Sequence, residues 1–130
     1  MIVGFDYWQV ISHYPDYFRQ LADMHREAGW KVVIISAVGD RTAGTVEADV
    51  RRLGFSSSVP VHEVKFNHPR ESPELKLAKC KELGVSVFYD DRDDVCALLQ
   101  ANGIMTLRVT RRDGSMYDLG SEARPEEEKS

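Results

Sequence analysis

The chain has 130 residues, of which 42% are hydrophobic and 29% are charged, and its formal net charge is -4. These values are typical of one globular domain, and a chain of this length buries roughly two-thirds of its unfolded surface on folding. The acidic balance argues against a general nucleic-acid binder, which would carry a basic stripe. We interpret the nearest basic group, Arg108, Arg111 and Arg112, as part of a solvated hairpin.

The sequence contains no clear targeting, membrane or metal-cysteine signal. No apolar run approaches the ~20 residues that span a bilayer, so we expect no membrane partner. The chain enters a predicted strand at Met1, which leaves no room for a targeting segment. Cys80 and Cys96 fall within predicted helices, without a close pair or a matching histidine spacing, which argues against zinc. These features predict a cytoplasmic protein with reduced cysteines.

The predicted strands and helices alternate along the chain. The apolar segments that read as buried strands are 1–5, 31–35, 61–66, 85–88 and 104–110. The helices between them begin near Pro15, Val46, Ser72 and Val95 and are closed by Gly29, Gly54, Gly84 and Gly103. This order predicts an α/β fold: a three-layer, Rossmann-like, five-stranded parallel sheet with helices on both faces and right-handed crossovers.

The predicted elements form a single domain at positions 1–120. A hairpin is expected within 111–119, around Asp113-Gly114. The Glu-rich tail at 121–130 is expected to be disordered.

Acidic residues gather where two of the predicted strands end. Asp6 follows the first strand, and Asp90 and Asp91 follow the fourth. The carboxyl ends of parallel strands form the ligand-binding edge of an open α/β sheet, so these carboxylates meet if the two strands are neighbours. Carboxylates ~5 Å apart repel by ~3 kcal/mol per pair at an effective dielectric of ~20, which requires a cation or raised pKa values. Oxygen ligands of this kind suit Mg²⁺.

The order of these residues resembles the four motifs of the haloacid dehalogenase superfamily. The resemblance extends to about Thr110 and rests on Asp6, on Ser36 after the second strand, on a lysine that opens the third helix, and on Asp90-Asp91. It implies that strands one and four are neighbours at the centre of the sheet. It also implies a Mg²⁺-dependent phosphatase or phosphotransferase.

The resemblance assigns a role to each matched residue. Asp6 would be a metal ligand and the nucleophile that forms an aspartyl-phosphate. Ser36 would hydrogen-bond the phosphoryl oxygens. Either Asp90 or Asp91 would hold Mg²⁺, with the backbone carbonyl of Trp8 as a further ligand.

Helical spacing selects the lysine. Lys76, Cys80 and Leu83 share one stripe of the third helix, and Cys80 and Leu83 are expected to face the sheet. Lys76 then points inward from the first turn, near the aspartates, where it balances the carboxylates and a bound phosphate. Lys65, on the third strand, is the alternative.

Trp8 departs from the pattern of the superfamily. Its phosphatases place a second aspartate, the general acid and base, two residues after the nucleophile, where this chain has Trp8. An indole N–H cannot protonate a leaving alkoxide, and loss of general acid–base catalysis costs about 10²–10⁴-fold, or ~3–5 kcal/mol of barrier. We therefore expect weak or atypical turnover. The alternative is a catalytically degenerate metal- or phosphate-binding module, or a regulatory or interaction protein.

Three further residues near the motifs are candidate contacts. Tyr7 and Trp8 are expected to touch the substrate, to stack in the pocket and plug it, or simply to pack under the loop. Asp94, in the first turn of the fourth helix, is expected to orient a metal-bound water or to cap the helix.

The motif spacing leaves no segment for a cap domain. One helix separates Asp6 from Ser36, and one helix and one strand separate Ser36 from Lys76. An open site suits a large phosphorylated substrate, such as a nucleic-acid end or a protein, or a cap supplied by another chain. Residues 84–92, together with the helix that follows them, are also similar to the 3′-phosphatase domain of phage-type polynucleotide kinases, although Trp8 counts against the same activity. A response-regulator receiver is a third interpretation, although its paired acids would follow the first strand.

Overall fold

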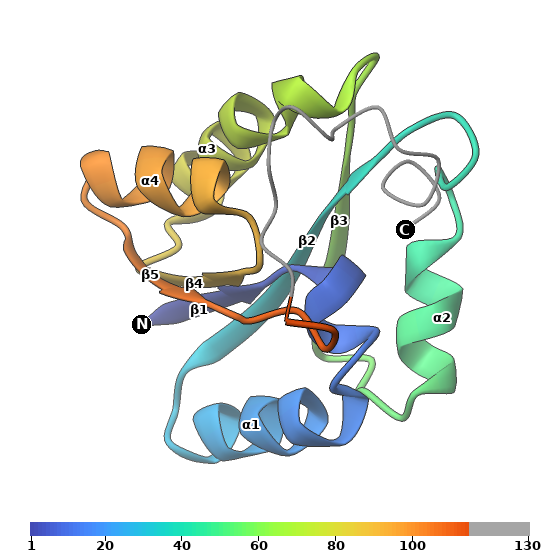
Figure 1. The fold of residues 1–130 in the computed structure, drawn as a ribbon. Helices are drawn as coiled ribbons and strands as arrows, with labels where there is room; N and C mark the ends of the chain where they lie inside the picture. Colours follow the sequence, from blue (N-terminus) through green and yellow to red (C-terminus); the bar gives the residue numbers. More distant parts are fainter. Residues whose placement is uncertain (115–130) are drawn as a thin grey trace.

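A computed structural model describes residues 1–114, and within them five parallel strands form a sheet in the order β3-β2-β1-β4-β5 (Figure 1). The strands are β1 (Ile2–Phe5), β2 (Lys31–Val38), β3 (Val61–Lys65), β4 (Val87–Asp90) and β5 (Met105–Arg108). β1 lies at the centre and pairs with β2 on one side and β4 on the other. The predicted α/β class, with the first strand beside the fourth, is confirmed.

Helices cover both faces of the sheet and complete three layers (Figure 1). On one face lie α1 (Pro15–Glu27) and α2 (Val46–Arg52), and on the other α3 (Ser72–Leu83) and α4 (Asp93–Ala101). Two short helical turns complete the described elements. The first, η1 (Tyr7–Ile11), follows β1, and the second, η2 (Pro69–Glu71), leads into α3.

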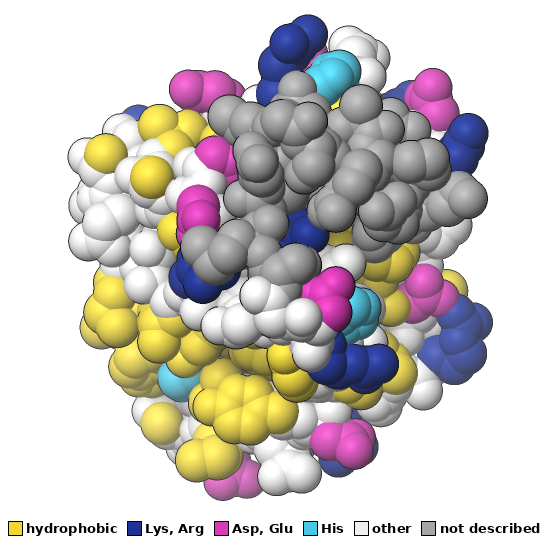
Figure 2. Space-filling view, in the orientation of Figure 1, with side chains coloured by type: hydrophobic (Ala, Val, Ile, Leu, Met, Phe, Trp, Pro, Cys, Tyr) yellow, Lys and Arg dark blue, Asp and Glu magenta, His cyan; other side chains and the backbone are white. Residues whose placement is uncertain are grey.

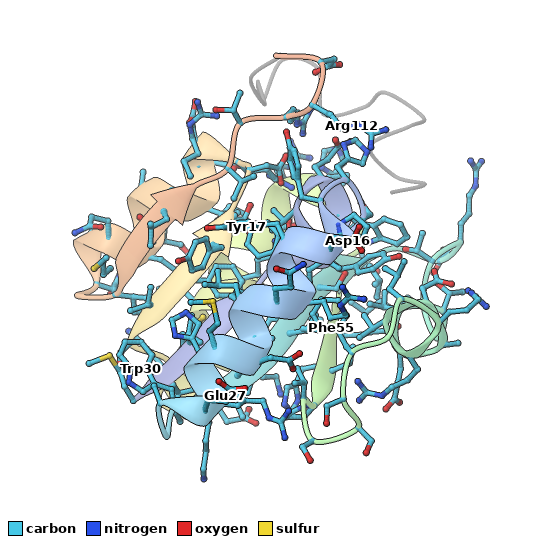
Figure 3. The ribbon with its side chains drawn as sticks, turned by 90° about the horizontal axis from the view of Figure 1, so that it is seen from below. Asp16, Tyr17, Glu27, Trp30, Phe55 and Arg112 are labelled. Atoms are coloured by element: carbon cyan, nitrogen blue, oxygen red, sulfur yellow. The ribbon has the colours of Figure 1, made fainter. Side chains whose placement is uncertain are left out.

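Each face of the sheet has its own hydrophobic core. Ile34 and Ile35 are adjacent in β2 and enter opposite cores, as the alternation of side chains along a strand requires. Their buried partners include Phe5, Phe18 and Val50 on the α1–α2 face and Leu77, Phe88 and Leu99 on the α3–α4 face. Seen from below, Phe55 lies between α1 and α2, where it joins the first of these cores (Figure 3).

The close pairing of β1 with β4 depends on a glycine. Gly4 is the register partner of Phe88, and a Cβ atom on Gly4 would lie 2.5 Å from the Phe88 ring. A side chain at this position would displace the ring or push the strands apart. Gly4 therefore helps to keep the carboxyl ends of β1 and β4 side by side.

Two element boundaries differ from the predictions. β2 continues to Val38 instead of ending at position 35, because it stays paired with β3 as far as that residue. Ser36 therefore lies inside a strand. α4 begins at Asp93 instead of Val95, and β4 extends to Asp90, so only two residues separate the strand from the helix.

The end of the predicted domain stays a prediction. The hairpin expected at 111–119 lies partly outside the described residues, and the acidic tail at 121–130 lies wholly outside them. Within residues 1–114, no helix combines the length and the apolar character that crossing a bilayer requires.

The visible surface mixes both signs of charge. Lys, Arg, Asp and Glu side chains are spread over the face shown in Figure 2, whereas hydrophobic side chains gather at its lower left, near α1. The exposed Tyr17 and Met24 belong to α1. The mixture of charges outside the grey atoms agrees with the absence of a basic stripe in the sequence.

Candidate functional site

Three buried carboxylates meet at the carboxyl ends of β1 and β4. The backbone N–H of Asp6 donates to the Tyr89 carbonyl at 2.9 Å, which continues the pairing of the two strands by one residue. Asp6, Asp90 and Asp91 are 3%, 0% and 2% exposed, and one oxygen from each lies within 4.8 Å of the others. The structure therefore brings the three predicted acids together in a setting where their charges interact strongly.

Lys76 lies between two of these acids. Its Nζ is 2.6 Å from Asp90 Oδ2 and 3.1 Å from Asp6 Oδ1, and the side chain is 2% exposed. The first turn of α3 supplies it, on the stripe that also buries Cys80. The alternative, Lys65, pairs instead with Asp40 at 2.9 Å and is 56% exposed. Helical spacing therefore predicted correctly which lysine contacts the acids.

Arg111 is the cation that the sequence analysis missed. Its Nε is 2.7 Å from Asp91 Oδ2, and its side chain is 4% exposed. The interpretation of Arg111 as part of a solvated hairpin was wrong, because its side chain is buried and paired with Asp91. The only sequence signal was its position just beyond a strand at the edge that carries Asp91.

Asp90 and Asp91 have different surroundings although they are adjacent. Asp90 Oδ1 accepts the backbone N–H of Arg92 at 3.0 Å, and its Oδ2 is engaged by Lys76. Asp91 is paired with Arg111 and lines a pocket that Asp6 and Lys76 also line. Asp91 is therefore the member of the pair that lines the pocket, although its side chain is buried.

Asp94 is held by local bonds. Arg92 donates to its two oxygens from Nε at 3.0 Å and from a terminal guanidinium nitrogen at 2.8 Å. The backbone N–H of Val95 also donates to Asp94, at 2.8 Å. Asp94 is the second residue of α4, whose N-cap is Arg92, and no described side chain caps this helix, so these contacts do not give Asp94 the capping role that was one of its two predicted roles.

The pocket opens between η1, η2 and the first turn of α3. The residues that line it are Asp6, Trp8, Gln9, Ala37, Phe66, Pro69, Ser72, Lys76, Asp91 and Arg92. Ser36 is not among them, although it is fully buried. Because side chains alternate along β2, Ser36 shares a face with Ile34 and Val38, whereas Ala37 faces the pocket. The phosphoryl-binding role expected of Ser36 stays a prediction.

The two aromatic residues after Asp6 contact each other but have different surroundings. Tyr7 is 6% exposed and belongs to the α1–α2 core, with its ring packed edge-on against Trp8 at 4.6 Å between centroids. Trp8 lines the pocket, and no residue in the described part of the chain accepts a hydrogen bond from its Nε1. Gln9 adopts a left-handed conformation, with φ of 65°, which costs a non-glycine residue about 1–3 kcal/mol. The strained turn lies directly beside Asp6.

The charges of the cluster do not balance. Burial, and next the charge of Asp90, raise the pKa of Asp6 well above its ordinary value, and Lys76 only partly opposes this. Burial likewise raises the pKa of Asp90. Burial alone would lower the pKa of Lys76, but the charges of Asp6 and Asp90 outweigh it and the pKa is raised. Among residues 1–114, the cations paired with the three carboxylates are Lys76 and Arg111, so the ionised acids and these two cations sum to one excess negative charge, which a proton or a metal ion can neutralise.

The residues of the cluster fit a hard divalent cation. Carboxylate oxygens are the ligands that Mg²⁺ prefers, and this ion also keeps several waters. Asp6 and Asp91 supply oxygens next to a pocket, and the excess negative charge at the cluster would favour a cation. Asp6 and Asp91 are the side chains that would hold it.

Fold and site together define an α/β protein with a buried Asp–Lys cluster at the ligand-binding edge of its sheet. No protein-family model and no curated protein sequence matches the chain. Its fold is similar to that of a chain in a structure titled "Structure of the Pnkp1/Rnl/Hen1 RNA repair complex", with a TM-score of 0.58 and 15% sequence identity over 83% of this chain. This chain corresponds to 42% of that neighbour's length, so the likeness concerns the fold of one part of it.

Proposed function

We propose that this chain is a Mg²⁺-dependent hydrolase of the haloacid dehalogenase type that acts on phosphoric esters, with Asp6 as its nucleophile. The observation that carries the proposal is the cluster itself. A buried aspartate, a buried lysine 3.1 Å from it and a second acid open to the same pocket lie at the edge where such enzymes bind their ligands. The likeness to a chain of an RNA repair complex supports the fold on which this proposal rests.

Asp6 attacks phosphorus with a carboxylate oxygen, and the bond from phosphorus to the leaving oxygen breaks. The product is an aspartyl-phosphate, which water hydrolyses to return the carboxylate and free phosphate. Bound Mg²⁺ would neutralise the phosphoryl oxygens and favour the ionised form of Asp6. Lys76 contributes a fixed positive charge beside Asp6 throughout, since the charges of Asp6 and Asp90 outweigh the effect of burial and keep it protonated.

The surroundings of Asp90 and Asp91 favour different roles for the two residues. We assign the metal to Asp91, together with Asp6 and the backbone carbonyl of Trp8, because Asp91 lines the pocket. Asp90 acts as a positioning residue, since both of its oxygens are engaged by Lys76 and by the Arg92 backbone. Arg111 fixes the orientation of Asp91.

Trp8 limits the reaction to leaving groups that need no proton, or makes it slow. The indole can donate a hydrogen bond but cannot transfer its proton near neutral pH. The same deficit affects the second step, because no carboxylate at this position activates the water. The aspartyl-phosphate of Asp6 should therefore accumulate.

A large phosphorylated substrate fits the open side of the pocket. Among the described residues, β1 and β2 are joined by η1 and α1, and no inserted domain covers the site. The neighbour from an RNA repair complex favours a nucleic-acid end as the substrate over a small metabolite. A protein phosphoester is the alternative.

Turnover of p-nitrophenyl phosphate and of 3′-phosphorylated oligonucleotides, each with Mg²⁺, tests the proposal against an Asp6→Asn control. p-Nitrophenolate needs no proton to leave, so this substrate bypasses the deficit at Trp8. If the wild type and Asp6→Asn are equally inactive on every substrate, the proposal that this chain is an enzyme is wrong.

A binding module is the second candidate, and Trp8 in the place of the acid is the observation that favours it. Its signature is Mg²⁺ or phosphate binding in the wild type without hydrolysis and without a trapped aspartyl-phosphate. Isothermal titration with Mg²⁺ and with inorganic phosphate distinguishes it from an enzyme.

A further inference from the structure

Two neutral donors line the pocket without a hydrogen-bond partner. The Oγ of Ser72 is fully buried and the Nε1 of Trp8 is shielded from solvent, and neither has a partner within residues 1–114. Both side chains line the same pocket as Asp6 and Lys76. Buried polar atoms are normally hydrogen-bonded, so an unpartnered pair that shares one pocket indicates a ligand with acceptor atoms.

The two donors come from two different elements that border the pocket. Ser72 is the first residue of α3 and precedes Lys76 by four positions, so their side chains lie on the same face of the helix. The amino end of this 12-residue helix favours negative charge. Trp8 comes from a separate element, η1, and it follows the nucleophile Asp6 by two residues. A tetrahedral oxyanion in front of Asp6 thus has donors available from two different elements.

We propose that Ser72 Oγ and Trp8 Nε1 donate hydrogen bonds to oxygens of the phosphoryl group bound in front of Asp6. This assignment rests on the proposed function and deepens it. Ser72, rather than Ser36, is then the hydroxyl that binds the phosphoryl group. Trp8 supplies a fixed donor to an oxygen that carries charge, although it transfers no proton.

Ser36 provides an internal comparison for this assignment. It is a serine as fully buried as Ser72, and its Oγ also lacks a partner among the described residues. It differs in place, because the pocket is lined at β2 by Ala37 and not by Ser36. The two serines therefore separate the effect of an unpartnered hydroxyl in general from the effect of one that reaches the ligand.

Orthovanadate with Mg²⁺ is the probe, and the fluorescence of Trp8 is the readout. The chain has two tryptophans, so a Trp30→Phe background leaves Trp8 as the single tryptophan, whose fluorescence is excited selectively over that of tyrosine. We expect vanadate to shift its emission saturably. In this background Ser72→Ala should weaken vanadate binding roughly 10- to 100-fold, as expected for a lost hydrogen bond to a charged group.

The remaining variants complete the series, with titration calorimetry as the readout that does not need Trp8. Trp8→Phe keeps an aromatic ring but removes the donor, and it should weaken vanadate binding by roughly tenfold. Ser36→Ala should change the affinity less than about threefold. Ser72→Cys keeps the size of the side chain with a weaker donor, and it replaces Ser72→Ala if that variant does not fold.

The outcomes separate this assignment from the proposed function. If the wild type binds vanadate and Asp6→Asn abolishes turnover, but Ser72→Ala and Trp8→Phe bind as tightly as the wild type, this assignment is wrong and the proposed function stands. The same holds if Ser36→Ala alone loses affinity. If the wild type binds neither vanadate nor inorganic phosphate, both proposals fail together.

Discussion

The same residue types, Asp, Lys and Arg, form ion pairs in two contrasting regions of the molecule. On α1, Asp16 and Asp23 pair with arginines one turn away at 3.7 and 3.8 Å, and Asp16 is 86% exposed at the outer surface of the helix (Figure 3). At the ends of β1 and β4, Lys76 contacts two acids at 2.6 and 3.1 Å, with every partner at most 4% exposed. Exposed pairs are screened and contribute little, whereas a buried cluster must be balanced. The contrast shows that burial, rather than residue type, marks the site.

The largest effect is expected when the nucleophile is removed. Asp6→Asn should lower turnover of p-nitrophenyl phosphate by on the order of 10³-fold or more, because the amide cannot attack phosphorus. Its melting temperature should not fall, since burial and the charge of Asp90 already disfavour the ionised carboxylate. Asp16→Asn, on the exposed face of α1, is the matched control and should retain full turnover. A variant Asp6→Asn with wild-type turnover would remove Asp6 from the mechanism.

Removing the central cation should have the next largest effect. Lys76→Met leaves two buried carboxylates without their cation and should lower the free energy of unfolding by about 3–5 kcal/mol. Lys65→Met breaks the exposed pair with Asp40 and should leave urea unfolding unchanged within error. Similar unfolding midpoints for the two variants would show that burial does not distinguish the regions.

Substitutions of the two adjacent acids should have different effects, one mainly on Mg²⁺ binding and the other mainly on the free energy of unfolding. Asp91→Asn should weaken Mg²⁺ binding by roughly tenfold or more, because it replaces a pocket-facing carboxylate ligand with a neutral amide. Asp90→Asn should cost stability instead, by about 3 kcal/mol, because it disturbs the ion pair with Lys76. Titration calorimetry with Mg²⁺ and urea unfolding of both variants measure these effects. A larger loss of Mg²⁺ affinity in Asp90→Asn would reverse the assignment.

The pH dependence should give the smallest effect. The folded chain holds the Asp6 proton more tightly than the unfolded chain, whose Asp pKa is about 4. Stability without metal should therefore fall as the pH rises from about 4 toward the raised pKa, by up to ~1.4 kcal/mol per pH unit for each proton. The raised pKa of Lys76 affects stability only in the alkaline range. Urea unfolding of the wild type and of Asp6→Asn over this range, with and without Mg²⁺, checks whether the slope belongs to Asp6.

The sequence predicted the parts of the site that follow from element order and helical spacing. Asp6, Asp90 and Asp91 each follow a strand, so a parallel sheet with β1 beside β4 brings them to one edge. Lys76 was selected because its stripe on α3 also carries Cys80, and that stripe does face the sheet. The adjacency of β1 and β4 was implied by the resemblance to the haloacid dehalogenase superfamily, whereas the choice of Lys76 within its helix needed only helical periodicity.

The parts that the sequence did not predict depend on pairing and on the path of the chain. The length of β2 is set by its pairing with β3, and this placed Ser36 inside a strand, on the face away from the pocket. Arg111 lies 20 residues after Asp91, so no periodicity links the two residues, and their contact depends on where the chain runs beyond β5. The sequence indicated Ser72 only as the start of the third helix, and its place beside the pocket required the position of α3 over the sheet.

Chemical trapping of the covalent intermediate tests the central claim most directly. Protein incubated with p-nitrophenyl phosphate and Mg²⁺ is treated with borohydride, which reduces an aspartyl-phosphate to homoserine, and is then digested for peptide mass spectrometry. Because Trp8 supplies no base for the second step, we predict homoserine at position 6 in the wild type, dependent on Mg²⁺ and absent from Asp6→Asn. Substrate turnover without any modification at position 6, or modification at a different carboxylate, would contradict the account.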